Sequence, residues 1–201
     1  MWHHVTSFGD SALLLPVIAW MAIVLGMSPR RRDALRWILA AIGCGGMVAL
    51  SKLAFMAWGI GPPGLDYTGF SGHTALALLT WPSLAALLVR RMATRPLAWL
   101  AIAAGVALGG AVGISRLALE VHSVSEVTMG ATLGVIVAAW FIHGLRRDDA
   151  PPAWHLLLLA TGIVILWFIF YGRIFPSQHV LKDIALWVSG HSNVFTRHTH
   201  R

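Results

Sequence analysis

Charged residues and cysteines are scarce in this sequence of 201 residues. Asp, Glu, Lys and Arg together make up 11% of it, whereas a soluble domain usually carries about a quarter. The one cysteine, Cys44, has no partner, so no disulfide can form within the chain. No acidic or Cys/His cluster has the spacing of a metal site. We therefore expect neither a disulfide-stapled fold nor a metal or other cofactor.

Long runs without Asp, Glu, Lys or Arg take up much of the chain, in which 57% of residues are hydrophobic. Each run reaches the roughly 20 residues that a helix needs to cross a bilayer core. Helices satisfy their own backbone groups there, where water is absent. We predict an all-α fold, a polytopic membrane helical bundle with six transmembrane helices. The runs cover residues 11–29, 67–89, 96–115, 127–145 and 150–172, and a sixth, 37–65, is interrupted only by Lys52.

Arginines gather in alternate loops between these runs. Residues 30–36, 90–95 and 146–147 hold nine of the 15 basic residues. By the positive-inside rule these loops face the cytoplasm, and both termini lie on the outer side. The net charge of +7 therefore indicates membrane topology and gives no sign of a nucleic-acid partner. No required protein partner can be identified from the sequence.

Five titratable or cationic residues converge on the predicted outer face. Lys52 lies near the outer end of its span. His73 stands at the beginning of the next span, also on the outer side, directly after Ser71 and Gly72. The helix N-terminus there is suited to an anion. Between spans four and five, "SRLALEVHSVSEV" supplies the rest of the group. These residues are Arg116, His122 and Glu126.

The residue types in this group suit phosphoryl transfer. His122 and Glu126 are four apart, so a helix would put them on one face, where the carboxylate could hold the imidazole in one tautomer. Lysine and arginine provide fixed positive charge for a phosphate. Two histidines can divide the work, one attacking phosphorus and the other protonating the leaving oxygen.

These motifs resemble those of the type 2 phosphatidic acid phosphatase superfamily, the membrane lipid phosphatases. The third motif, S-R-x5-H-x3-D in the family, reads S-R-LALEV-H-SVS-E here, and the second, P-S-G-H, reads F-S-G-H. The resemblance covers about residues 52–127. It implies that His122 is the nucleophile, Glu126 its orienting carboxylate and His73 the general acid. It also implies a phosphate-binding set. That set consists of Lys52, Ser71, Gly72, Arg116 and, in support, Ser115.

The sequence departs from the family pattern in three ways. Gly59 stands where an arginine is usual in the first motif, and Glu126 is longer by one methylene than the usual aspartate. The chain also has one span before the Lys52 helix and one after the His122 helix, where many relatives have two and none. Arg173 or Lys182 from the C-terminal tail could replace the missing cation, on the ground that they share its side of the membrane.

The resemblance implies a metal-independent hydrolase acting on a lipid phosphate or diphosphate through a phosphohistidine. Undecaprenyl diphosphate is the preferred substrate, because a site facing the periplasm of a bacterial inner membrane meets that lipid. We predict a membrane domain over residues 1–172 and an outward-facing tail over 173–201, with an interfacial helix near 178–188. The second Ser-Gly-His, at 189–191, launches no span and is interpreted as coincidence.

Three other functions remain open at this point. A phosphatase-like scaffold could bind or transport a lipid phosphate without cleaving it, as Gly59 suggests. Gly69 to Gly72 also fit the G-x-S-G of rhomboid proteases, with Ser71 as nucleophile and His143 or His155 as its base. Both histidines, however, are predicted at the opposite face. A haem carrier with His73 and His122 as axial ligands would leave the neighbouring charges unexplained.

Overall fold

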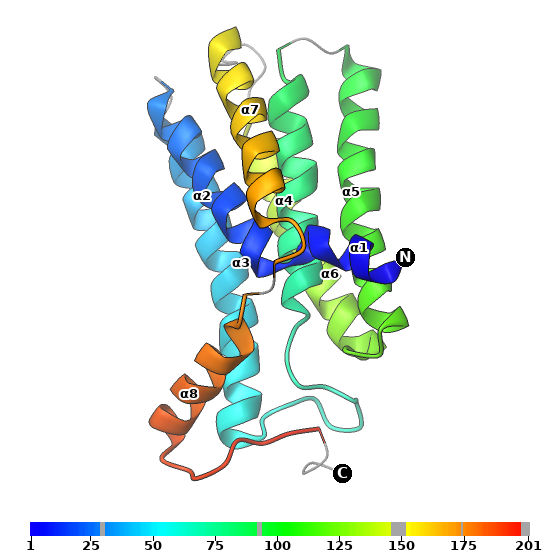
Figure 1. The fold of residues 1–201 in the computed structure, drawn as a ribbon, viewed down its shortest axis with the longest axis vertical. Coiled ribbons are helices and arrows are strands. Elements are labelled where there is room, and N and C mark those ends of the chain that lie inside the picture. The colour runs from blue at the N-terminus through cyan, green and yellow to red at the C-terminus, as the bar shows by residue number, and fades with distance from the viewer. Residues whose placement is uncertain (29–30, 92–93, 146–151, 174, 198–201) are drawn as a thin grey trace.

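The computed structural model describes the whole chain except residues 29–30, 92–93, 146–151, 174 and 198–201, and the described residues contain helices and no strand (Figure 1). Six of the helices are long and apolar enough to cross a membrane, which confirms the predicted fold class. In chain order the helical elements are α1 (Trp2–Thr6), η1 (Ser7–Gly9), α2 (Ser11–Met27), α3 (Arg31–Trp58), α4 (Gly72–Val89), α5 (Arg95–Ala118), α6 (Val124–His143), α7 (Ala153–Phe170) and α8 (Ser177–Ser189).

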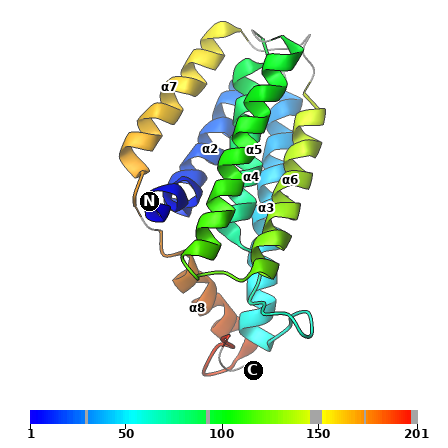
Figure 2. The same cartoon turned by 90° about the vertical axis from the view of Figure 1, so that its right-hand side faces the viewer.

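The long helices run side by side, while two short segments depart from this direction (Figures 1 and 2). The N-terminal α1 lies across the bundle, and α8 lies beyond one end of it. With 28 residues, α3 is about 42 Å long at 1.5 Å per residue, longer than the roughly 30 Å hydrocarbon core. Its last turns extend past the start of α4 and give α8 and the C-terminal tail a surface to pack on.

The central helix of the bundle is α4, which is the most buried of the six spans. Glycines on its neighbours allow the close approach. A Cβ at Gly105 of α5 would lie 2.6 Å from the Cα of Pro82, and one at Gly130 of α6 would lie 2.7 Å from the Ser71 carbonyl oxygen. Small residues of this kind let membrane helices pack backbone to backbone. They let α5 pack against the middle of α4 and α6 pack against its N-terminal end.

At the end of the bundle where α3 begins, α4 ends in a buried ion pair. Arg90 Nη1 donates to Asp33 Oδ2 at 2.7 Å, with both side chains almost fully buried.

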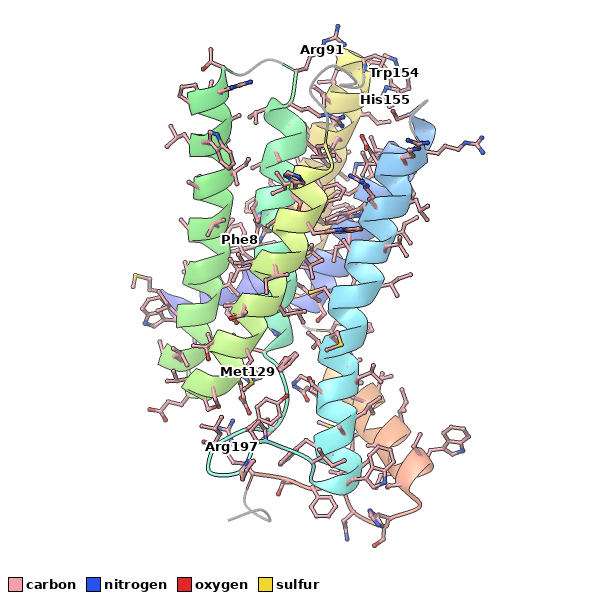
Figure 3. All side chains as sticks on the ribbon, turned by 180° about the vertical axis from the view of Figure 1, so that it is seen from behind. Phe8, Arg91, Met129, Trp154, His155 and Arg197 are labelled. Carbon is pink, nitrogen blue, oxygen red and sulfur yellow. The ribbon has the colours of Figure 1, made fainter. Side chains whose placement is uncertain are left out.

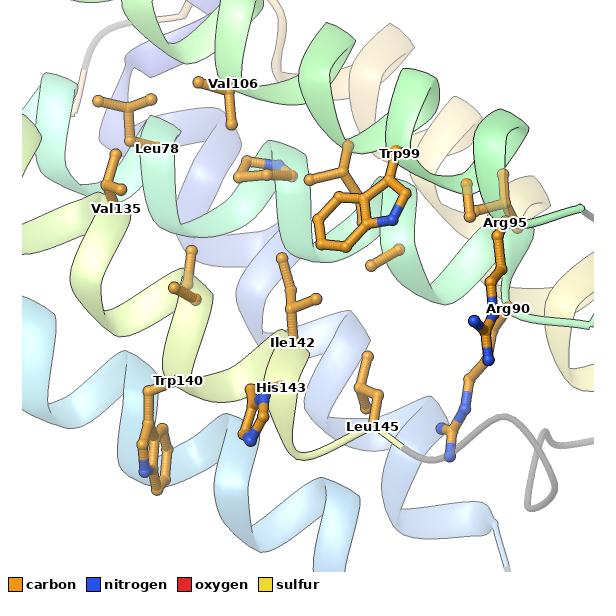
Figure 4. A pocket seen from close by; sticks show the side chains of 17 residues that line it. Leu78, Arg90, Arg95, Trp99, Val106, Val135, Trp140, Ile142, His143 and Leu145 are labelled. Carbon is orange, nitrogen blue, oxygen red and sulfur yellow. The ribbon is translucent and has the colours of Figure 1, made fainter.

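Beside this ion pair is an apolar cavity of about 840 Å³ between α4, α5 and α6, lined among others by Trp99, Trp140 and Ile142 (Figure 4). None of the residues predicted for the phosphatase site lines this cavity.

Candidate active site

The helix ends that carry the predicted site residues meet at the end of the bundle nearer α8. They are the last part of α3, the start of α4, the end of α5 and the start of α6. Figure 3 shows Arg197 at this end, near Met129 of α6, and His155 at the opposite end. The structure thus brings Lys52, His73, Arg116, His122 and Glu126 to one end of the molecule, and both chain termini reach them.

His122 and Glu126 are in direct polar contact. Their Nδ1 and Oε2 atoms lie 2.6 Å apart, and both side chains are buried. A carboxylate only accepts hydrogen bonds, so Nδ1 carries the proton and Nε2 keeps its lone pair. Burial lowers the pKa of His122 below its ordinary value, opposed by the hydrogen bond to Glu126 and reinforced by Lys52 and Arg116. The imidazole is therefore neutral near pH 7 and suited to nucleophilic attack through Nε2.

Six hydrogen bonds converge on the Glu126 carboxylate, which is fully buried. Its Oε1 accepts from the Thr68 amide at 2.7 Å and hydroxyl at 2.5 Å. Its Oε2 accepts from His122 and from the Ser123 amide at 3.1 Å. Arg197 Nη2 lies 3.0 Å from each oxygen. Such a set holds the carboxylate ionised and fixes its orientation.

Local sequence explains why Glu126 points back at His122. The structure places His122 in the turn before α6, so the two residues do not share a helix face as predicted. Instead Ser123 and Glu126 form a capping box, in which the serine hydroxyl accepts from the Glu126 amide at 3.3 Å. The S-x-x-E signal at 123–126 is visible in the sequence. Its role in directing the Glu126 carboxylate toward the His122 imidazole was not predicted.

The loop between α3 and α4 closes over Lys52, which is buried. Gly69 has a φ of +122°, and a Cβ there would lie 2.6 Å from Lys52 Cγ, so a side chain is excluded at this position. Gly59 ends α3 with a φ of +66°, its amide donating to the Phe55 carbonyl at 2.8 Å. Glycine at 59 is therefore a helix stop. An arginine there would strain the backbone.

The structure shows how Ser71, Gly72 and Ser115, three residues of the predicted phosphate-binding set, are held. Ser71 precedes the first residue of α4, but its hydroxyl contacts Thr74 Oγ1 at 2.9 Å and does not cap the first-turn amides. Gly72 begins α4, and the Ser115 hydroxyl donates to the Val112 carbonyl of its own helix at 2.6 Å. The amides at the start of α4 thus remain the feature suited to an anion. The phosphate-binding role of these residues stays a prediction.

The N-terminal segment supplies two site contacts that sequence reasoning did not find. Asp10 caps α2 by accepting from the Ala12 amide at 2.8 Å, and its Oδ2 lies 3.5 Å from His73 Nε2. Thr6 accepts from Arg116 Nη1 at 2.8 Å. The capping position of Asp10 was readable from the sequence, because it directly precedes an apolar helical run. Its approach to His73 depends on how α2 packs against α4.

The Asp10→Asn substitution is expected to slow hydrolysis of lipid phosphates about tenfold, in the range typical of partners that orient a reacting group. The asparagine oxygen can still cap α2, but the negative charge beside His73 is lost. Reaction of p-nitrophenyl phosphate, whose leaving group needs little protonation, should change much less. Phosphate release from both substrates measures this difference.

Asp183→Asn, on the exposed part of α8, is the matched control and should match wild type. Equal losses on both substrates would contradict an orienting role for Asp10 and indicate general damage.

The C-terminal tail also reaches the site, through Arg197. Its Nε lies 3.0 Å from Asp66 Oδ1, and its Nη2 contacts Glu126. The two tail cations suggested from the sequence are not the ones in contact with this carboxylate. The Arg173 guanidinium lies over the Phe170 ring, and the described contacts of Glu126 do not include Lys182. Nothing in the sequence pattern marks Arg197, which lies 71 residues after Glu126.

The geometry separates the other candidate residues from this group. His143 ends α6 and His155 lies in the first turn of α7, at the end of the bundle opposite Ser71 (Figure 3), so neither can serve Ser71 as a base. The second Ser-Gly-His is a helix end: Gly190 has a φ of +68° and terminates α8. Among the described residues no group of three or more His, Cys, Asp or Glu side chains could hold a metal ion.

The assembled groups can carry out nucleophilic chemistry on an anion. Lys52 and Arg116 act electrostatically on both His73 and His122, so fixed positive charge surrounds two imidazoles. His122 has a free attacking nitrogen, and His73 has a carboxylate that can support a proton on its ring. The fold and these residues define the chain as a helical membrane protein that gathers two histidines, two cations and a buried carboxylate at one end of its bundle.

Comparison with known proteins gives the family. The model of the PAP2 superfamily matches residues 58–150. The chain is also 38% identical over 200 residues to the "Uncharacterized 22.5 kDa protein in cps region" of Klebsiella pneumoniae, covering 98% of this chain and 95% of that protein. No solved structure matches. The chain belongs to the PAP2 superfamily, and this membership suggests a phosphatase. Asp10, Lys52 and Arg197 lie outside the segment that the family model matches.

Proposed function

We propose that the protein is a metal-independent lipid phosphatase that forms a phosphohistidine on His122. The observation that carries the proposal is the buried His122–Glu126 pair at 2.6 Å, which leaves Nε2 as the attacking atom. The cations Lys52 and Arg116 act electrostatically on His122 and also on the second histidine, His73. Family membership supports phosphate-ester chemistry for this arrangement.

The reaction proceeds in two balanced steps. His122 Nε2 attacks phosphorus, the bond from phosphorus to the leaving oxygen breaks, and that oxygen takes the proton of His73. A water molecule then attacks the phosphohistidine, gives a proton to His73, and the P–N bond breaks to release inorganic phosphate. Lys52, Arg116 and the amides at the start of α4 balance the charge that develops on the phosphoryl oxygens. Ser71 and Gly72 position those amides, and Ser115 supports the site.

The substrate we propose is a membrane lipid phosphate or diphosphate, with undecaprenyl diphosphate as first choice. The site lies at the end of six apolar helices, where a lipid can deliver its headgroup from the membrane plane. Arg31, Arg36 and Arg95, which belong to the predicted cytoplasmic loops, lie at the other end of the bundle, and residues 146–147 lie outside the described part of the chain. This position supports a periplasm-facing site in a bacterial inner membrane. The contacts of Thr6, Asp10 and Arg197 with the site support placing both termini outside as well.

The test is phosphate release by protein purified in detergent, with EDTA present, from undecaprenyl diphosphate and phosphatidic acid. We expect release without added metal, together with an acid-labile, base-stable phosphoenzyme trapped from ³²P-labelled substrate. A folded protein that releases no phosphate from either lipid would overturn the proposal. Retained binding of the labelled lipid would then favour a scaffold that binds or transports lipid phosphates without cleaving them.

A further inference from the structure

The end of the chain folds back onto the site along the outer end of α3 (Figure 1). After α8 ends at Gly190, His191 Nδ1 lies 3.1 Å from the Ala57 carbonyl, and the Phe195 amide donates to the Met56 carbonyl at 2.9 Å. These two contacts with carbonyl groups of α3 fix the path of the tail up to Phe195, two residues before Arg197. The guanidinium therefore arrives at the site from a defined direction.

Arg197 links the buried carboxylate of the site to an exposed one. Its Nη2 lies 3.0 Å from both oxygens of Glu126, which is fully buried, and its Nε lies 3.0 Å from Oδ1 of the more exposed Asp66. The side chain of Arg197 itself is 28% exposed. It also lines a cavity of about 390 Å³ with residues of the 61–67 loop. The tail thus covers the outer side of the His122–Glu126 pair.

The direction of these contacts indicates what Arg197 does. Glu126 meets the Nδ1 side of His122, whereas a phosphate would be attacked by Nε2, on the other side of the ring. Arg197 therefore acts on the carboxylate and not directly on the reacting phosphoryl group. Glutamate has one more rotatable bond than aspartate. One guanidinium nitrogen, Nη2, contacts both Glu126 oxygens while Nε is held by Asp66, and this restricts that freedom.

We infer that Arg197 is a positioning residue, supplied by the C-terminal tail, that holds Glu126 against His122 for phosphoryl transfer. The inference rests on the proposed function and names a further residue for that reaction. It assigns the tail a part in the site, although the tail follows the last membrane span. Asp66 completes the arrangement by holding the guanidinium from its outer side.

Arg197 also affects the charge balance around His122. The positive charge of Arg197 partly offsets the negative charge of Glu126, which stabilises the protonated form of His122. Removal of the Arg197 charge should therefore raise the pKa of His122. Attack requires the neutral ring, and activity is lost as pH falls through this pKa. The acidic limb of the kcat/KM profile should therefore move to higher pH when Arg197 is neutralised. The charged or titratable groups that act on His122 from the packed elements are Lys52 (α3), Arg116 (α5), Glu126 (α6) and, through Glu126, Arg197.

The experiment compares Arg197→Met, Arg197→Lys and wild type in the full-length protein, with undecaprenyl diphosphate as substrate. Arg197→Met keeps the aliphatic stem, and we expect kcat to fall about tenfold with little change in KM and an acidic limb at higher pH. Arg197→Lys keeps the positive charge but loses the planar guanidinium. The acidic limb of its kcat/KM profile should therefore stay near that of wild type, and its kcat should lie between those of Arg197→Met and wild type. Arg173→Ala, a tail cation away from Glu126, is the control and should leave both unchanged.

Two results would overturn the inference. An Arg197→Met protein with wild-type kcat and an unshifted limb would show that the contact is incidental. A protein with raised kcat would show that the tail restrains the enzyme and does not assist it. If Arg197→Met fails to fold, judged by gel filtration and thermal unfolding, the kcat and pH limb of Arg197→Gln decide the same question. Failure of the proposed function is distinct, because wild type itself would then release no phosphate.

Discussion

A His122→Ala protein is expected to release phosphate from lipid substrates at the background rate, at least about a thousandfold below wild type. The reason is structural: Nε2 of His122 is the attacking atom that the Glu126 contact leaves available. His73 cannot substitute for it, because its Nε2 faces Asp10. The measurement is phosphate release under single-turnover conditions, together with the loss of the trapped phosphoenzyme.

His143→Ala is the matched control for this experiment. His143 lies at the far end of α6, away from the group, and its removal should leave turnover and phosphoenzyme unchanged. A rhomboid-like mechanism would instead require His143 or His155 and would tolerate loss of His122. Retention of more than a tenth of wild-type release by the His122→Ala protein would exclude His122 as the nucleophile.

Glu126→Gln should reduce turnover by about a thousandfold or more, as loss of the orienting carboxylate does in other histidine-dependent enzymes. Glutamine has nearly the same shape as glutamate, but its NH₂ group would replace one of the two oxygens that accept hydrogen bonds. This NH₂ group would then face donors. Thr68, Ser123 and Arg197 all donate to this carboxylate, so at least one buried donor would lose its partner. That loss costs about 1–3 kcal/mol, and a lower thermal unfolding midpoint should accompany the loss of activity.

Glu120→Gln provides the comparison, since Glu120 is an exposed carboxylate in the turn just before His122. Its turnover and unfolding midpoint should equal those of wild type. If Glu126→Gln kept a tenth or more of the activity, the capping box alone would be sufficient to orient His122. The hydrogen bonds from Thr68 and Arg197 would then have only a structural role.

Much of the site could be predicted because its motifs are short and each is continuous in sequence. Lys52, His73, Arg116, His122 and Glu126 were predicted at one end of the bundle, and the structure places them there. The contact between His122 and Glu126 was also predicted, but for a different reason. A capping box, and not a shared helix face, brings the two side chains together.

The tail illustrates where a sequence pattern stops being informative. Two Ser-Gly-His copies have the same letters, yet Gly72 begins a membrane helix and Gly190 ends an amphipathic one. What distinguishes them is the apolar run that follows only the first copy. The tail cation that contacts Glu126 carries no such marker. The sequence suggested Arg173 or Lys182, whereas the structure puts Arg197 on the carboxylate.

The sequence by itself determined the six membrane helices and the helix ends that carry histidine, lysine and arginine. It placed the boundaries of five helices to within five residues, whereas α3 begins six and ends seven residues earlier than the run 37–65. These features depend on hydrophobic length and on neighbours within one helical turn, both of which are readable along the chain. Only the tertiary structure decided that Asp10 faces His73, that Thr68 binds Glu126 and that Arg197 closes over the pair. These contacts join segments separated by more than fifty residues. Helix packing and the path of the tail create them, and no periodicity in the sequence encodes either.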